Sequence, residues 1–172
     1  VTIHFVTGKV NGYFDAETQT NKDWNKLLDQ AVSPVMDVKT RYMQLAYPVE
    51  FLKKFDYGKG KELAQAYDQI MTQQYEFCGA LKYNRVPEKR ILARVNFNYF
   101  MFRDGDGVAF LGNESTMKSA LGPNIYKDWG VNHEIGHVMQ MSPQLTWVLS
   151  ISMAPNETGS IFFSFLICLD AV

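Results

Sequence analysis

The 172-residue sequence has no block of basic residues and carries a formal net charge of −1. Nucleic acids and anionic membranes bind proteins through clustered Lys and Arg, so this charge balance indicates neither partner. Cysteine is also scarce, since Cys78 and Cys168 are the only two, and their spacing forms no metal-binding pair. They either pair with each other or remain free. No apolar run is long enough to span a membrane, because residues 155–157 (Pro-Asn-Glu) interrupt the apolar stretch 145–169.

The start of the sequence lacks a recognisable signal peptide. Residues 1–6 are strand-like from the first position, which favours a mature or excised segment over a natural N-terminus. With 47% hydrophobic and 20% charged residues, the chain is suited to one globular domain with a substantial core. We therefore expect a single domain over residues 1–172, acting as a monomer. Its apolar C-terminal end favours an incomplete domain that needs a following segment to cover it.

Histidine is rare, and two of the three histidines fall in one motif. Residues 133–137 read His-Glu-Ile-Gly-His. On a helix, residues i and i+4 share a face, so His133 and His137 can each present a ring nitrogen to one metal ion. Glu134 lies about 100° further round the helix, where a carboxylate can act as base on a water molecule. Two His ligands, a carboxylate base and an open coordination position predict a Zn²⁺ peptidase site.

The alternative interpretation of this motif is a helix that carries two unremarkable histidines. Gly136 slightly favours that alternative, because a glycine inside a helix costs about 1 kcal/mol relative to alanine. It can equally mark a point where a substrate or another backbone comes close. The flanking residues support a helix, since Asp128 or Asn132 can cap its start and Ser142-Pro143 can end it.

A third metal ligand must come from outside the motif, because two histidines hold zinc weakly. Only two acidic residues follow, Glu157 and Asp170. Glu157 precedes the apolar run 161–169, which we expect to form a second helix packed against the first. Asp170 lies two residues before the end of the sequence, where a ligand is poorly placed. We therefore favour Glu157, for which the simpler explanation is a Glu favoured at a helix N-terminus by the helix dipole.

Helical periodicity predicts three helices before the motif. Thr20 or Asn21 can cap the first. A brief helix is expected over residues 48–55, and the clearest helix follows the Gly-Lys-Gly-Lys stretch at 58–61 and stops at Gly79. That Gly-Lys stretch lacks the spacing of a phosphate-binding loop, so we reject a nucleotide site.

Alternation of apolar and polar residues predicts the strands. One or two strands are expected in residues 1–14, and an extended segment at 38–47. Residues 91–103 alternate throughout, which predicts one half-buried strand that forms a hairpin with residues 108–111. Residues 112–128 are expected to form a loop with one helical turn. The fold class is therefore α+β, a mixed sheet followed by the motif helix and a third-ligand helix.

Four stretches, residues 1–8, 82–87, 99–110 and 133–140, carry a family resemblance. They resemble the enhancin-like zinc metallopeptidases (family sixty of the metallopeptidases), especially gut-bacterial members that act on mucin-type glycoproteins. The resemblance covers most of residues 1–147.

This resemblance implies a zincin-like, gluzincin-type fold with Zn²⁺ as cofactor. It implies His133 and His137 as ligands, Glu134 as base and Glu157 as third ligand. Family members follow the ligand Glu with a polar, Asn-containing helix, whereas residues 158–163 here are Thr-Gly-Ser-Ile-Phe-Phe. They also continue with a further helical part, so the resemblance implies an incomplete catalytic domain. The implied location is secreted, cell-surface or periplasmic, in a bacterium.

The leading functional hypothesis is a zinc-dependent endopeptidase that hydrolyses peptide bonds of glycoproteins such as mucins. The strand carrying Asn96 and Asn98 can pair with an extended substrate, which makes these two the candidate substrate-binding residues. Trp129 and Trp147 can stack on sugars, although packing around the motif helix is the simpler interpretation. The alternative is a non-catalytic glycoprotein-binding module that retains the zincin fold, and a third possibility is a metal-free structural domain.

Overall fold

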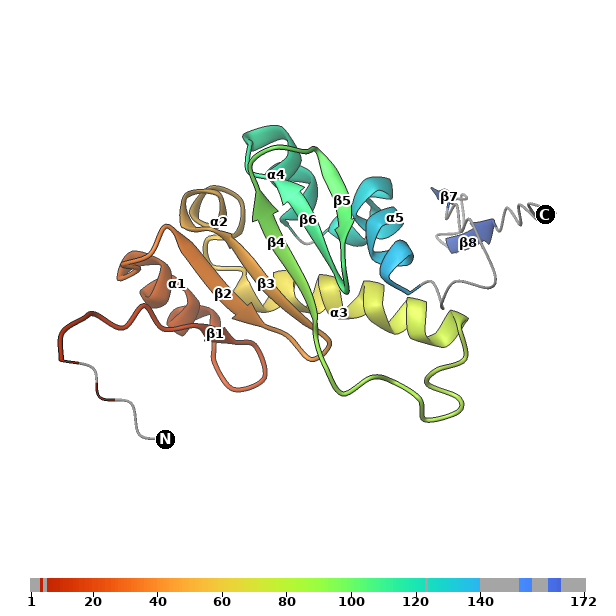
Figure 1. The fold of residues 1–172 in the computed structure, drawn as a ribbon, viewed down its shortest axis with the longest axis horizontal. Coiled ribbons are helices and arrows are strands. Elements are labelled where there is room, and N and C mark those ends of the chain that lie inside the picture. The colour runs from red at the N-terminus through yellow and green to blue at the C-terminus, as the bar shows by residue number, and fades with distance from the viewer. Residues whose placement is uncertain (1–3, 5, 123, 140–151, 156–160, 165–172) are drawn as a thin grey trace.

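The computed structural model describes residues 4, 6–122, 124–139, 152–155 and 161–164 (Figure 1). Along the chain the elements are β1 (Phe14–Asp15), α1 (Asn21–Asp29), β2 (Val35–Lys39), β3 (Met43–Pro48), α2 (Val49–Asp56), α3 (Gly60–Phe77), β4 (Ile91–Asn96), β5 (Met101–Asp104), β6 (Gly107–Leu111), α4 (Glu114–Ala120), the 3₁₀ turn η1 (Ile125–Lys127), α5 (Trp129–Val138), β7 (Ser152–Pro155) and β8 (Ile161–Ser164). The structure is therefore a mixed α+β fold, as the sequence predicts.

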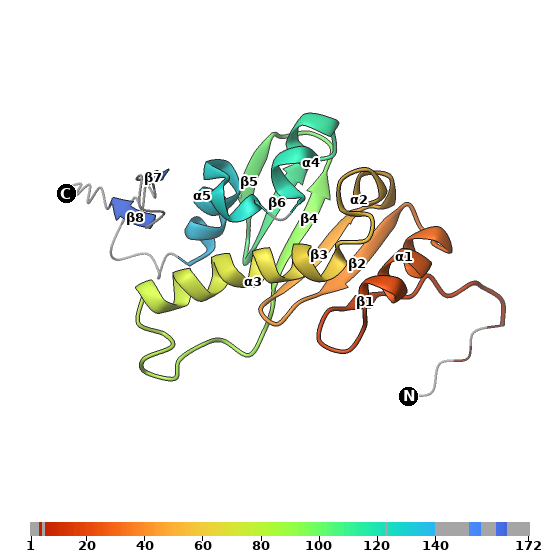
Figure 2. The same cartoon turned by 180° about the vertical axis from the view of Figure 1, so that it is seen from behind.

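Six of the strands form one mixed sheet in the order β1-β2-β3-β4-β6-β5. β3, β4 and β6 run parallel at its centre, while β2 and β5 are antiparallel to their neighbours β3 and β6. β5 comes last in the strand order and is therefore an edge strand. Its Met101 lies opposite Phe110 of β6. α3 crosses one face of this sheet, as Figure 2 shows.

The core lies between the sheet and the helices. Its largest fully buried side chains are Phe14, Trp24, Tyr47, Tyr67, Tyr75 and Phe110. The Tyr67 hydroxyl contacts the Tyr47 hydroxyl and donates a hydrogen bond to the backbone oxygen of Ala120 at 2.9 Å. Both phenols can therefore be buried without leaving a polar atom unsatisfied, and burial raises the pKa of both. Among the helices described, none is both apolar enough and long enough to cross a membrane.

The start of α1 and the end of α3 agree with the sequence. Thr20 caps α1 through a reciprocal capping box with Asp23, and Gly79 follows α3 with a φ of +75°. The rejected phosphate-loop stretch has a packing role instead. A Cβ on Gly60 would lie 2.5 Å from the indole Cγ of buried Trp24, so the start of α3 approaches α1 more closely than another residue would allow.

Over residues 6–13 the strands expected in residues 1–14 are wrong, because the described strand in this region is β1, Phe14–Asp15. Residues 1–3 and 5 lie outside the described part. Asn11 explains part of the difference. Its side chain accepts hydrogen bonds from the backbone N–H groups of Val32 and Ser33 and donates one to the Val35 oxygen. These bonds tie the chain to the loop before β2 in place of a regular ladder.

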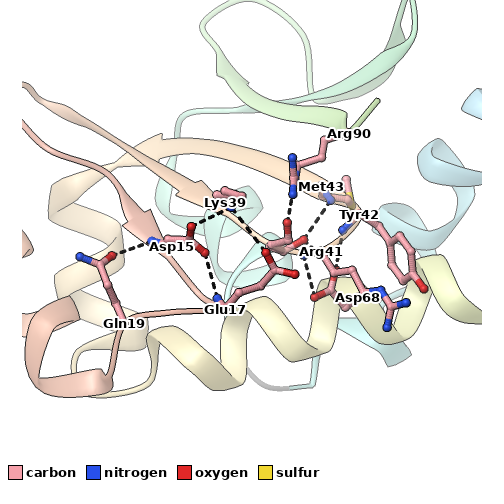
Figure 3. A network of polar contacts seen from close by, with 10 residues as sticks. Asp15, Glu17, Gln19, Lys39, Arg41, Tyr42, Met43, Asp68 and Arg90 are labelled. Carbon is pink, nitrogen blue, oxygen red and sulfur yellow. Dashed lines mark hydrogen bonds and ion pairs between the residues drawn. The ribbon is translucent and has the colours of Figure 1, made fainter. Parts of the chain in front are cut away.

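The extended segment expected at 38–47 is two strands joined by a tight turn. The carboxylate of Asp68, on α3, accepts hydrogen bonds from the Thr40 hydroxyl and from the backbone N–H groups of Arg41 and Tyr42. Arg90 donates to the Thr40 backbone oxygen at 2.7 Å, so two distant segments fix the turn (Figure 3). A turn held by residues so remote in sequence leaves no local signal.

The polar network in Figure 3 continues from this turn to the outer strand β1. Lys39 Nζ lies 2.7 Å from Asp15 Oδ2 and 3.4 Å from Glu17 Oε2. The hydrogen bond from Lys39 holds the pKa of Asp15 below its usual value. Glu17 is half-exposed, so the ion pair between Lys39 and Glu17 contributes mainly to the pairing geometry of β1 and β2 and little to overall stability.

The single strand expected at 91–103 is interrupted. β4 ends at Asn96, whose side-chain oxygen accepts hydrogen bonds from the backbone N–H groups of Asn98 and Tyr99. This local turn lifts the chain out of the sheet before β5 begins. Phe97 and Tyr99, expected on the buried face, are therefore 79% and 68% exposed.

Two further expectations differ from the structure. The predicted loop 112–128 contains α4, capped by the Asn113 side chain, and the turn η1. The predicted helix at 161–169 is wrong over Ile161–Ser164, which form β8 and pair antiparallel with β7. Isoleucine and two phenylalanines in succession favour a strand, and this propensity outweighs the apolar length that suggested a helix. Residues 165–169 lie outside the described part.

Asp56, the last residue of α2, is a buried carboxylate. Its Oδ2 accepts a hydrogen bond from the Gly122 N–H at 3.0 Å, whereas within the described residues Oδ1 has no partner. Burial raises its pKa to about 7, far above the value of about 4 expected in the unfolded chain.

Because the pKa of Asp56 is raised, we expect the free energy of unfolding to fall as pH rises. The folded chain retains the Asp56 proton up to about pH 7, while the unfolded chain releases it near pH 4, so the free energy of unfolding falls between these values, by up to about 4 kcal/mol. Asp56→Asn is expected to flatten this fall and to be more stable than the wild type at pH 7.5. Urea unfolding at pH 4.5, 6.0 and 7.5 measures both effects, with exposed Asp106→Asn as control. A fall of equal depth in Asp56→Asn would contradict the assignment.

Candidate metal centre

The motif residues lie on α5, as predicted. The Asp128 side chain caps the helix by accepting a hydrogen bond from the Val131 N–H at 3.0 Å. Asn132, the other candidate cap, is buried within the first turn. Its amide donates to the backbone oxygens of Ile125, Tyr126 and Asp128, and so ties α5 to the preceding 3₁₀ turn. The predicted stop at Ser142-Pro143 lies outside the described residues.

α5 packs directly beside the edge strand β5 (Figure 1). Gly130 allows this close approach, since a Cβ at that position would lie 2.8 Å from the Met101 sulfur. The sequence suggests Gly136 as a glycine at a point of close approach. The glycine that contacts β5 is Gly130. The helix and the edge strand thus form two sides of one surface region.

The two motif histidines point toward each other. The Nε2 atoms of His133 and His137 are 2.9 Å apart, and the two rings meet edge-on with centroids 4.5 Å apart. Without a metal, one ring nitrogen donates to the other, and the tautomers decide which. With zinc, each nitrogen would lie about 2.0–2.1 Å from the ion, which places two tetrahedral ligands about 3.3 Å apart. The observed separation is close to that value, so the pair fits one zinc ion.

The protonation of His133 also suits metal binding. Burial, together with the nearby His137, lowers the pKa of His133 below its ordinary value. The ring is therefore held in the neutral form, which has a lone pair to donate to a metal. Glu134 follows directly on the helix and is half-buried beside this pair.

The described residues contain no cluster of three potential metal ligands. Glu157 and Asp170, the two candidates for the third ligand, both lie outside the described residues. His133 and His137 are therefore the described part of the predicted site, and the third ligand stays a prediction.

The predicted substrate-binding asparagines differ in their surroundings. Asn96 is only 7% exposed, and its side-chain oxygen is engaged by the loop that follows β4. Asn98 is exposed in that loop. Among the described residues, the strand that follows this loop at the sheet edge beside α5 is β5.

Trp129 is placed differently from the expected core position. It is 52% exposed, and its ring stacks on His133 with centroids 4.5 Å apart and an interplanar angle of 25°. The i, i+4 spacing of Trp129 and His133 was the available sequence signal for this contact. Trp147 lies outside the described residues.

Comparison with solved structures shows that the fold is shared with known proteins. Three of the similar structures illustrate this. One is a metallopeptidase from Bacteroides thetaiotaomicron (TM-score 0.70, 20% identity, covering 80% of this chain and 24% of that chain). Another is a metallopeptidase in complex with Tn antigen (TM-score 0.69, 21% identity, covering 80% and 26%). A third is the catalytic module of the metalloprotease ZmpA from Clostridium perfringens (TM-score 0.64, 14% identity, covering 75% and 29%).

The chain spans about a quarter of the length of these solved chains. No curated protein sequence matches it. Residues 10–152, however, match the family described as Peptidase M60, enhancin and enhancin-like. Because this match covers well over half of the sequence, the chain belongs to the enhancin and enhancin-like M60 family of metallopeptidases.

Proposed function

We propose that the chain is part of a zinc-dependent endopeptidase that hydrolyses peptide bonds of glycoproteins, mucins among them. The observation that carries the proposal is the convergence of the His133 and His137 Nε2 atoms, 2.9 Å apart, on a helix beside an edge strand. We further propose that residues 1–172 belong to one catalytic domain, monomeric and secreted or displayed at a bacterial cell surface or in the periplasm.

His133, His137 and Glu157 would hold the zinc ion, which when bound supplies a Lewis acid for the scissile carbonyl. Glu134 would take a proton from the attacking water and deliver it to the leaving amine. The carboxylate suits this role because it follows His133 directly on α5 and therefore faces the same region from about 100° round the helix.

The substrate would lie along the edge strand β5. An extended peptide can add to an unpaired sheet edge through main-chain hydrogen bonds, and β5 offers such an edge next to α5. Asn98, exposed in the preceding loop, is placed to contact the substrate, while Asn96 would act by shaping that loop. Trp129, half-exposed beside His133, is an aromatic residue placed to contact a sugar. A glycoprotein substrate is further supported by the related metallopeptidase in complex with Tn antigen.

The third ligand gives the direct test of the metal site. The purified wild-type chain is expected to hold about one zinc ion, and Glu157→Ala is expected to lose it or bind it at least about 10-fold more weakly. Asp170→Ala is the matched control, since Asp170 is the other acidic residue after the motif. Metal content by mass spectrometry and zinc affinity by chelator competition measure both variants.

Three outcomes are informative. Loss of zinc in Asp170→Ala with retention in Glu157→Ala would exchange the two assignments. A wild-type chain without zinc affinity would contradict the enzyme proposal. Saturable mucin binding without new peptide ends would then favour the glycoprotein-binding module.

A further inference from the structure

Trp129 makes an unusual contact with one of the two candidate ligands. It is the first residue of α5, one helical turn before His133, and its indole lies nearly parallel to the imidazole at a centroid distance of 4.5 Å. Direct ring stacking of this kind restricts rotation of the imidazole about its side-chain torsions.

Among the described residues, no hydrogen bond orients the other nitrogen of His133. Nε2 faces His137, which leaves Nδ1 as the nitrogen that would not bind the metal. In metal sites that second nitrogen normally donates to a carboxylate or carbonyl, and this hydrogen bond fixes the ring. Here Nδ1 is buried and has no hydrogen-bond partner among the described residues. Within this part of the chain, the orientation of the ring therefore depends on packing.

The backbone of Trp129 is itself well fixed. Its neighbour Asp128 caps the helix through the Val131 N–H, and Gly130 on the other side is seated against Met101 of the edge strand. The indole is thus attached to a rigid helix start although about half of its surface is exposed. A half-exposed residue contributes little to the core, so its loss should leave the fold intact.

We propose that Trp129 is a positioning residue for His133, whose stacked indole holds the imidazole so that Nε2 faces the metal. The inference rests on the proposed function, because it requires His133 to be a metal ligand. Among the described residues, Trp129 takes the place of the hydrogen bond that usually orients a ligand histidine. The same contact covers one face of the imidazole.

The test compares Trp129→Phe, which keeps an aromatic ring, with Trp129→Leu, which does not, in the 172-residue chain. Zinc affinity by chelator competition is expected to fall about 10-fold in Trp129→Leu and less than about 3-fold in Trp129→Phe. Tyr83→Leu is the control, since Tyr83 is another exposed aromatic residue and lies outside the site. Its zinc affinity is expected to equal that of the wild type.

A second measurement needs no metal. In the zinc-free chain, the Cε1–H proton resonance of His133 is expected to shift downfield in Trp129→Leu, because the ring current of the stacked indole is lost. It should move much less in Trp129→Phe. Circular dichroism confirms that each variant is folded.

The outcomes separate this inference from the proposed function. Wild-type zinc affinity in Trp129→Leu, or equal losses in the Phe and Leu variants, would overturn the positioning role while leaving the enzyme proposal intact. A wild-type chain that does not bind zinc would overturn the proposed function. If the wild type does not bind zinc, the His133 resonance still tests the stacking. An unchanged resonance in Trp129→Leu would overturn the stacking, and a shifted resonance would support the stacking.

Discussion

The Glu134→Gln chain is expected to bind zinc as tightly as the wild type and to cleave a mucin substrate at least about 10³-fold more slowly. Glutamine has nearly the shape of glutamate, so α5 and the His133–His137 pair should be undisturbed. Its amide, however, cannot accept the proton that the attacking water must lose. The measurement counts new peptide amino termini released from a purified mucin over time, beside zinc affinity for both proteins.

Glu88→Gln is the matched control for this prediction. Glu88 is an exposed glutamate in the segment before β4, so the same loss of charge there should change neither zinc affinity nor cleavage. Wild-type cleavage by Glu134→Gln would remove Glu134 as the base. Loss of zinc together with cleavage would instead indicate that Glu134 contributes to holding the metal.

The motif helix was predictable because its signals are local. A side-chain cap at Asp128, helical spacing and the i, i+4 pair of histidines all lie within ten residues of one another. The same is true of α1 and its capping box, and of the hairpin between β5 and β6. Neighbouring residues determine the starts of these two helices and the turn of this hairpin, and the sequence predicts these points to within a residue or two.

The errors occur where a side chain bonds to the backbone in a way that periodicity does not reveal. Asp68 fixes the turn at residues 40–42 from a position 26 to 28 residues further along the chain. Asn96 ends β4 by accepting two N–H groups although the apolar alternation continues past it. Hydrophobic alternation describes which face a residue would occupy in a strand, and it does not detect a polar residue that stops the strand.

The site was predictable to a similar extent. The pairing of His133 with His137 follows from helix geometry alone, whereas the stacking of Trp129 depends on a rotamer that leaves the indole half-exposed. Because large aromatic residues are usually buried, sequence reasoning favoured the core for Trp129. The third ligand, whether Glu157 or Asp170, depends on how a distant segment packs, and helix geometry gives no constraint on it.

His137→Ala is expected to weaken zinc binding by more than about 100-fold. Loss of a residue that only hydrogen-bonds to a metal ligand weakens metal binding by about 10- to 100-fold, and loss of a ligand itself should weaken it more. The substitution removes one of the two nitrogens that converge at 2.9 Å, and a carboxylate with a single histidine cannot replace a three-ligand site. Chelator competition measures the loss, and circular dichroism checks that the half-buried position tolerates alanine.

The chain offers a control of the same residue type, because His4 is the one histidine outside the motif and is exposed. His4→Ala should bind zinc as the wild type does. Equal weakening in both variants would mean that zinc binds histidine side chains nonspecifically, since His4 has no part in the proposed centre. A loss confined to His137→Ala would place the ion on α5. The accompanying loss of cleavage would then be due to the missing metal, whereas in Glu134→Gln the metal remains and only proton transfer is removed.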